Sequence, residues 1–334
     1  MTVIENLGIR RIVVLGTGGT IAGAGEGTAS SGIEYVAGSV PVERLAYGIS
    51  VPYGYRLDFE QIAQLDSKDM NFAVWHQLAT RCSALVASPE VASIVITHGT
   101  DTIEGTAFFL HSVLRLGSKP VILTCAIRPT TAMAADGPQN LQDAIAVATA
   151  TKSNGDLVVC AGEIHDAVAV RKAHPYRLNA FESGEAGPVG FVEEGTARYV
   201  REASHNRDLL CNWDSVADHD PADWPRVEIL SNHAGVTGRL VELLIEERRQ
   251  DSSGGVAGLV IAATGNGSLN VDLEAAAHRA MEAGIPVWRV SRGLNGKIIR
   301  TSRDRLPESG GLYPVKARIA LMPTLLSGRK SSAV

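Results

Sequence analysis

Short apolar runs rich in β-branched residues recur along the first half of the chain, and each ends in a glycine or polar turn. Such runs are typical of strands that are buried on both faces, as in a parallel sheet. Several of the turns are followed by segments with apolar residues at helical spacing. We predict strands at residues 12–15, 93–97, 120–125 and 157–161, and helices at 70–86, 101–116 and 138–151. Strands that alternate with helices predict an α/β fold with a mostly parallel, doubly wound sheet.

A polar, proline-punctuated stretch without periodicity interrupts this alternation at residues 204–225. Because domain boundaries fall in such stretches, we interpret it as an interdomain linker. We therefore expect a larger N-terminal domain at 1–203 and a smaller α/β C-terminal domain at 226–334. The second domain should contain strands near 227–230, 259–263 and 286–290, and helices near 239–249, 272–283 and 314–323.

Local signals place some helix ends and one long loop. Asp69 is a candidate N-cap, Asp101 and Glu104 match a capping box, and Pro323 should end the last helix. Residues 22–54 are rich in Gly, Ser and Ala and weakly periodic, so we expect a long surface loop there. Loops of this length in compact domains often cover binding sites.

Composition narrows the function classes. Lys and Arg total 31 against 36 Asp and Glu, a net charge of −5, which favours neither a nucleic-acid partner nor an anionic membrane surface. We find no signal peptide and no membrane span, and therefore expect a cytoplasmic protein. The four cysteines form no C-x-x-C pair and the nine histidines show no metal-binding spacing, so we expect no disulfide and no metal.

Two strand-end turns carry the candidate chemistry. G-T-G-G-T-I-A-G contains Thr20, and T-H-G-T-D-T contains Thr100 and Asp101. The glycines of the first turn fit neither the dinucleotide fingerprint nor a phosphate-binding loop. Both turns follow parallel strands, so the two threonines could converge on one pocket at the same sheet edge. The alternatives are that each threonine only bonds to backbone and that Asp101 is an ordinary N-cap.

Five segments resemble the bacterial-type L-asparaginase family, also called the asparaginase/glutaminase family. They are T-G-G-T-I-A-G at 17–23, D-S-K-D-M-N at 66–71, I-T-H-G-T-D-T at 96–102, R-P-T-T-A-M-A-A-D-G-P at 128–138 and G-N-G-S at 265–268. The similarity runs in order from about residue 10 to residue 318. The resemblance implies hydrolysis of L-asparagine to L-aspartate and ammonia through an acyl-enzyme, without a cofactor. It leaves a minor glutaminase activity open.

The resemblance also implies roles for individual residues. Thr20 would be the nucleophile, assisted by Tyr35 from the long loop, for which Tyr47 and Tyr53 are alternatives. Lys172 and Asp101 would polarise the Thr100 hydroxyl, which relays a proton to or from water. Ser67 and Asp101 would hold the α-carboxylate and α-amino groups, and backbone around Thr20 and Ala126 would serve the amide oxygen. The substrate-binding set so implied is Ser67, Gly19, Gly99, Ala126 and Ser268. Which group first deprotonates Thr20 stays open.

One departure from the family pattern bears on selectivity. Many members carry a glutamate in the C-terminal domain that reaches the substrate's amino group across a subunit interface, whereas residues 291–300 contain no acidic residue here. Selectivity among L-Asn, L-Gln, D-Asn and asparaginyl peptides therefore stays open. The resemblance to the family also implies an oligomer, and we expect a homotetramer or homodimer. Two other functions remain: the amidase subunit of a tRNA-dependent amidotransferase, and a non-catalytic α/β protein that binds a small molecule.

Overall fold

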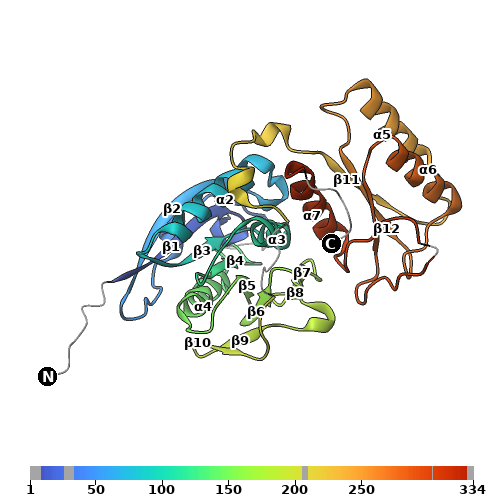
Figure 1. Cartoon of the computed structure of the whole chain (residues 1–334). Helices are drawn as coiled ribbons and strands as arrows, with labels where there is room; N and C mark the ends of the chain where they lie inside the picture. Colours follow the sequence, from blue (N-terminus) through green and yellow to red (C-terminus); the bar gives the residue numbers. More distant parts are fainter. Residues whose placement is uncertain (1–8, 26–33, 205–209, 303, 329–334) are drawn as a thin grey trace. The chain divides into compact units, whose positions relative to one another are not determined.

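The computed structural model describes residues 9–25, 34–204, 210–302 and 304–328 (Figure 1). The chain divides into two compact units, Met1–Asp208 and Leu209–Val334. Among the described helices, none has both the length and the apolar character that a bilayer span requires. Each unit is an α/β structure, as the alternation of strands and helices predicts.

An eight-stranded sheet forms the centre of the first unit, in the order β10-β9-β6-β5-β4-β3-β1-β2. Its strands are β1 (Arg10–Gly18), β2 (Tyr55–Leu65), β3 (Val91–Thr97), β4 (Val121–Thr124), β5 (Asp156–Cys160), β6 (Glu163–Asp166), β9 (Gly190–Glu193) and β10 (Thr196–Tyr199). The five strands from β2 to β5 are parallel, which confirms the predicted mostly parallel sheet. The antiparallel strands β6, β9 and β10 extend it, and the sequence pattern did not predict them.

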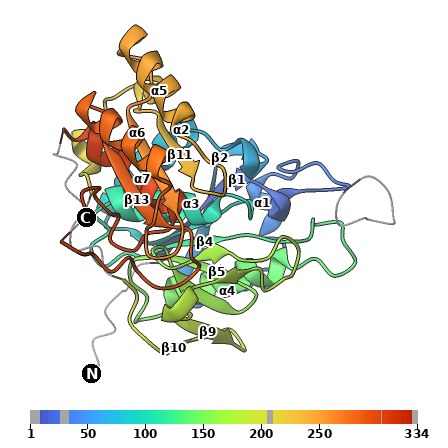
Figure 2. The same ribbon diagram turned by 90° about the vertical axis from the view of Figure 1, so that its right-hand side faces the viewer.

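Helices cover both faces of this sheet (Figure 1). They are α1 (Val42–Leu45), α2 (Phe72–Ala87), α3 (Ile103–Val113) and α4 (Gly137–Thr149). Ile12 and Val14 of β1 share a buried cluster with apolar residues of α4, whereas α2 and α3 meet through the stacked rings of Trp75 and Phe109. The hairpin of β9 and β10 lies beside α4 (Figure 2), where Val192 packs against the same cluster.

Two predicted helix starts need correction. Helix α2 is capped by Asn71, whose side chain accepts from Val74 N, and Asp69 instead belongs to the 3-10 turn η2 (Ser67–Asp69). Helix α3 begins at Ile103 without a side-chain cap, so no capping box forms. The carboxylate of Glu104 instead accepts a hydrogen bond from Lys172 N, which lies far away in the sequence. The predicted long loop at 22–54 contains α1, because Val42 is buried against the core.

The second unit has a three-stranded parallel sheet in the order β11-β12-β13. Its elements are β11 (Val227–Ser231), β12 (Gly258–Ala263), β13 (Val287–Ser291), α5 (Arg239–Gln250), α6 (Val271–Glu282) and α7 (Pro314–Leu326). Helices α5 and α6 bury Val241 and Ala276 in one core with the sheet. Helix α7 continues past Pro323, contrary to the prediction. Proline lacks only its own backbone N–H, and its carbonyl still accepts from Ser327 N in the last turn. The segment predicted as a linker contains the short helices η4 (Trp213–Ser215) and η5 (Pro221–Asp223).

Candidate active site

The first of the two threonine turns is built by consecutive glycines at the end of β1. Gly18 has φ +101° and Gly19 has φ +76°, backbone angles that L side chains rarely adopt. This turn reverses the chain into η1 (Thr20–Ala22), which places Thr20 just beyond the carboxyl end of β1. The Thr20 side chain is nearly buried, so its hydroxyl is held in a defined position.

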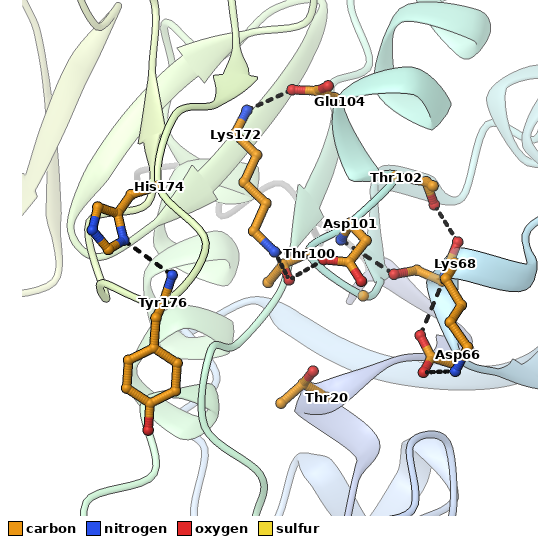
Figure 3. A network of polar contacts seen from close by, with 12 residues as sticks. Thr20, Asp66, Lys68, Thr100, Asp101, Thr102, Glu104, Lys172, His174 and Tyr176 are labelled. Atoms are coloured by element: carbon orange, nitrogen blue, oxygen red, sulfur yellow. Dashed lines mark hydrogen bonds and ion pairs between the residues drawn. The ribbon is translucent and has the colours of Figure 1, made fainter. Parts of the chain in front are cut away.

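The second turn follows β3, the parallel neighbour of β1, so the two turns meet at one sheet edge. Their backbones touch: a Cβ built on Gly19 would lie 2.3 Å from Gly99 Cα. Only glycine permits that approach. Thr20 and Thr100, each one residue beyond a touching glycine, are thereby brought together, as the sequence predicts. Figure 3 shows the Thr20 hydroxyl pointing toward the residues around Thr100.

Lys172 joins Thr100 and Asp101 into one cluster. Its Nζ donates to Thr100 Oγ1 over 2.8 Å and to Asp101 Oδ1 over 2.5 Å. The lysine comes from β7 (Arg171–Lys172), a short strand paired with β8 (Phe181–Glu182). Lys172 N also donates to Glu104 Oε2 over 2.5 Å, and this contact ties β7 to α3 (Figure 3). Glu104 is thus a positioning residue that the sequence analysis assigned to a cap.

Tyr35 is the tyrosine that reaches Thr20, with 2.6 Å between its hydroxyl and Thr20 Oγ1. Its ring packs on Gly23, where a Cβ would lie 2.7 Å from the ring. A backbone bridge between Ala24 and Val36 closes the base of this loop. The alternatives Tyr47 and Tyr53 are 94% and 103% exposed and have no place in the site.

Ser67 lies beside the second turn. Its Oγ accepts from Asp101 N over 3.2 Å, and its carbonyl accepts from Thr102 Oγ1 over 2.7 Å. Lys68, which the sequence analysis did not single out, adds a cation next to Ser67. Lys68 Nζ bonds to Asp66 Oδ2 over 2.6 Å, and this carboxylate raises the pKa of Lys68.

Ala126 follows β4 at the same sheet edge and is fully buried. Its neighbours Ile127 N and Arg128 N each donate to the carboxylate of Asp136 over 2.9 Å. Asn140 Nδ2 donates to the carbonyl of Cys125 over 2.8 Å. The backbone around Ala126 is therefore fixed by two side chains at the start of α4. Asp136 lies inside the motif at 128–138 and Asn140 lies just beyond it, and the sequence analysis missed the role of both.

His98 was also missed, although it lies inside the second motif. Trp75 Nε1 donates to Thr106 Oγ1, Thr106 Oγ1 lies 2.9 Å from His98 Nε2, and His98 Nδ1 lies 2.8 Å from the carbonyl of Gly99. Since a carbonyl only accepts, Nδ1 carries the proton and Nε2 accepts from Thr106. Burial lowers the pKa of His98 to about 4, so the neutral ring orients the Gly99 peptide.

Ser268 belongs to the second unit and is not part of this cluster of the first unit. It closes a turn in which Ser268 N donates to Thr264 O over 2.8 Å and Thr264 Oγ1 donates back to Ser268 O. Within the described ranges, no group of three or more His, Cys, Asp or Glu residues is arranged to hold a metal ion.

Comparison with known proteins adds two family matches. Residues 11–205 match the model described as Asparaginase, N-terminal, and residues 226–334 match the Glutaminase/Asparaginase C-terminal domain. L-asparaginase 2 of Bacillus subtilis is 34% identical over 331 residues, covering 96% of this chain and 84% of that protein. Glutaminase-asparaginase of Pseudomonas fluorescens is 32% identical, covering 97% and 88%. The crystal structure of a probable cytoplasmic L-asparaginase from Campylobacter jejuni superposes with a TM-score of 0.85 at 31% identity, covering 95% of each chain.

Proposed function

The chain belongs to the asparaginase family, and we propose that it hydrolyses the side-chain amide of L-asparagine to L-aspartate and ammonia, with Thr20 as the nucleophile. The observation that carries this proposal is the convergence of two hydroxyl groups with a lysine and a carboxylate at one sheet edge. Thr20 is bonded to Tyr35, and Thr100 is bonded to Lys172 beside Asp101. A threonine hydroxyl needs such an adjacent proton acceptor to attack an amide.

In the first step, Thr20 Oγ1 attacks the carbonyl carbon of the side-chain amide, and its hydroxyl proton is relayed to the leaving nitrogen through the Tyr35 hydroxyl, which accepts it as it passes its own proton on. The carbonyl oxygen gains negative charge, which the fixed backbone around Thr20 and Ala126 stabilises. Collapse of the tetrahedral intermediate breaks the C–N bond. The nitrogen takes up a proton and leaves as ammonia, and an aspartyl ester remains on Thr20.

In the second step, water attacks this ester. Lys172 and Asp101 polarise Thr100, and the Thr100 hydroxyl relays a proton: it takes one from the attacking water as it passes its own to the Lys172–Asp101 pair. The C–O bond to Thr20 then breaks, Thr20 Oγ1 is reprotonated and aspartate is released. The same cluster thus serves hydrolysis of the ester rather than its formation.

Substrate selection rests on residues next to this cluster. We assign Ser67 and Asp101 to the α-carboxylate and α-amino groups of the substrate, because the hydrogen bond from Asp101 N to Ser67 Oγ holds these two residues next to each other. Gly19 and Gly99 contribute by letting the two turns touch, and Ser268 would act from the second unit. Since residues 291–300 contain no carboxylate, a panel of L-Asn, L-Gln, D-Asn and asparaginyl peptides measures how far the amino group is recognised.

Two broader features complete the proposal. We assign the chain to a homotetramer or homodimer, which size-exclusion chromatography with light scattering measures directly. We place it in the cytoplasm, because the structural neighbour from Campylobacter jejuni is named a probable cytoplasmic L-asparaginase. A relative from Haemophilus influenzae is instead named a probable periplasmic L-asparaginase. Cell fractionation distinguishes the two compartments.

The decisive experiment is ammonia release from L-asparagine by the wild type and by Thr20→Ala. We expect the variant to lose at least about 10³-fold in kcat, as nucleophile removal does in other acyl-transfer enzymes. Thr196→Ala, an exposed threonine of β10, is the matched control and should keep full activity. Equal ammonia release by wild type and Thr20→Ala contradicts the nucleophile assignment. Asparagine binding without ammonia release by the wild type favours the non-catalytic alternative.

A further inference from the structure

A cavity of about 740 Å³ lies in the first unit against the amino-terminal half of α4. Its walls come from α4, the turn after β5 and the turn between β9 and β10, and include Arg128, Gln139, Asp143, Ala161, Leu178 and Glu194. None of these six residues bonds to Thr20, Thr100 or Lys172 in the described part of the chain. The six residues therefore lie outside the hydrogen-bond network of the catalytic cluster.

Asp143 is a buried carboxylate on this wall, only 4% exposed. Its Oδ1 accepts from Gln139 Nε2 over 2.8 Å, and among the described residues its Oδ2 has no hydrogen-bond partner. Burial raises the pKa of Asp143 above its ordinary value. A carboxylate in a cavity wall, one oxygen of which accepts no hydrogen bond from the described residues, is a site for an ammonium group or another strong donor.

Arg128 supplies the opposite charge at the same cavity. Its Nη1 donates to Ala134 O over 3.0 Å, and within the described ranges its guanidinium forms no ion pair. A guanidinium with free donors binds a carboxylate in a two-pronged geometry. Leu178 and Ala161 add apolar surface to the wall of the same cavity.

We propose that this cavity is a binding site for a free α-amino acid, whose ammonium group meets Asp143 and whose carboxylate meets Arg128. The ligand class matches the charges of the wall, which carries the Arg128 guanidinium for a carboxylate and the Asp143 carboxylate, with Glu194 also in the wall, for an ammonium group. The apolar wall accepts the aliphatic part of the side chain. This binding goes beyond the proposed hydrolysis, since it requires none of the catalytic residues.

The site is connected to the catalytic backbone. Arg128 N and Ile127 N both donate to Asp136, and Asn140 holds the carbonyl of Cys125, so the segment around Ala126 is attached to the cavity wall. Asn140 Oδ1 also accepts from Ala161 N. A ligand that immobilises Arg128 therefore immobilises the backbone that faces the substrate amide. Hydrogen exchange at Ile127 N and Arg128 N should slow when the cavity is occupied.

Isothermal titration of the Thr20→Ala chain with L-asparagine tests the proposal, because binding is then read without turnover. We expect two sites per chain. Adding Asp143→Asn should weaken one site by roughly 30-fold or more, as removal of one partner of a charge pair does. Adding Ser67→Ala should weaken the other site instead. Glu185→Gln, an exposed acid of η3 (Gly184–Ala186), is the matched control and should leave both sites intact.

L-asparaginamide, which lacks the carboxylate, tests the Arg128 contact. It should bind the cavity at least about 10-fold more weakly than L-asparagine, and Arg128→Met should abolish that difference. A single site that Ser67→Ala removes and Asp143→Asn does not change overturns the proposal, as does a second site unaffected by both cavity variants. If the wild type releases no ammonia, the proposed function fails but this titration keeps its meaning. If ammonia is released and only one site binds, the cavity proposal alone fails.

Discussion

Replacing Lys172 by methionine separates catalysis from folding in this protein. The substitution keeps the length and the apolar stem of the side chain and removes the ammonium group. That group lies 2.8 Å from Thr100 Oγ1 and 2.5 Å from Asp101 Oδ1, so Thr100 loses its polarising donor. We therefore expect ester hydrolysis to slow while the binding of asparagine through Ser67 persists.

The size of the effect follows from these contacts. A positioned proton-transfer group contributes about 10²–10⁴ in rate, which corresponds to about 2.7–5.5 kcal/mol in activation free energy. The effect on folding is far smaller, because the Asp101 side chain is 53% exposed and Lys172 is 17% exposed. A partly solvated ion pair of this kind contributes less than about 1 kcal/mol to the free energy of unfolding. The melting temperature should therefore fall by only about 2–4 °C.

The assay is steady-state ammonia release with the aspartate product followed by NMR, alongside thermal unfolding by circular dichroism. Rapid-quench measurements should show the aspartyl ester accumulating on Thr20, since the proposed mechanism assigns hydrolysis of this ester to the cluster that contains Lys172. Lys152→Met, an exposed lysine outside the site, is the control for loss of one positive charge. A kcat within threefold of wild type for Lys172→Met would refute the role of the Thr100 cluster.

Three further outcomes are expected. Gly19→Ala should be inactive and lose at least about 2–3 kcal/mol in the free energy of unfolding, because its Cβ would overlap Gly99. The control Gly48→Ala, with φ +81° and open surroundings, should lose only about 1–2 kcal/mol. Equal losses for the two variants in urea titrations would contradict the close approach of Gly19 and Gly99. Tyr35→Phe should lower kcat about 10²-fold with an unchanged melting temperature, and an unchanged kcat would remove Tyr35 from the mechanism. The pKa of His98 is about 4 in the folded chain and 6.5 for an unperturbed histidine, as in the unfolded chain. The neutral ring therefore contributes about 3 kcal/mol to the free energy of unfolding above pH 6.5, and this contribution is lost as the pH falls toward 4. Urea unfolding of wild type and His98→Asn at pH 4.5 and 7 measures this difference, and an identical pH slope for both would contradict it.

The parallel half of the sheet and the two threonine turns were predictable because their signals are local. A run such as residues 12–15 shows its burial in its own composition, and Gly18 and Gly19 show the need for a turn that other residues resist. The antiparallel strands β6, β9 and β10 carry no comparable signal, because their sequences E-I-H-D, G-F-V-E and T-A-R-Y contain no unbroken apolar run like that at 12–15. Strand β2 does alternate at Tyr55, Leu57 and Phe59, and this signal was overlooked beside the long loop that precedes it.

The amino-acid pattern was enough to predict the class of fold and the turns that end β1 and β3, and the family resemblance implied that Lys172 acts with Asp101. The folded chain adds the contact that joins these two residues across 71 positions, and it shows that Glu104 holds the strand carrying this lysine rather than capping α3. The physical reason is the range of the forces involved. Periodicity and backbone angles act between near neighbours in the chain, whereas hydrogen bonds between side chains form wherever packing of the whole unit brings their atoms within 3 Å or so of one another.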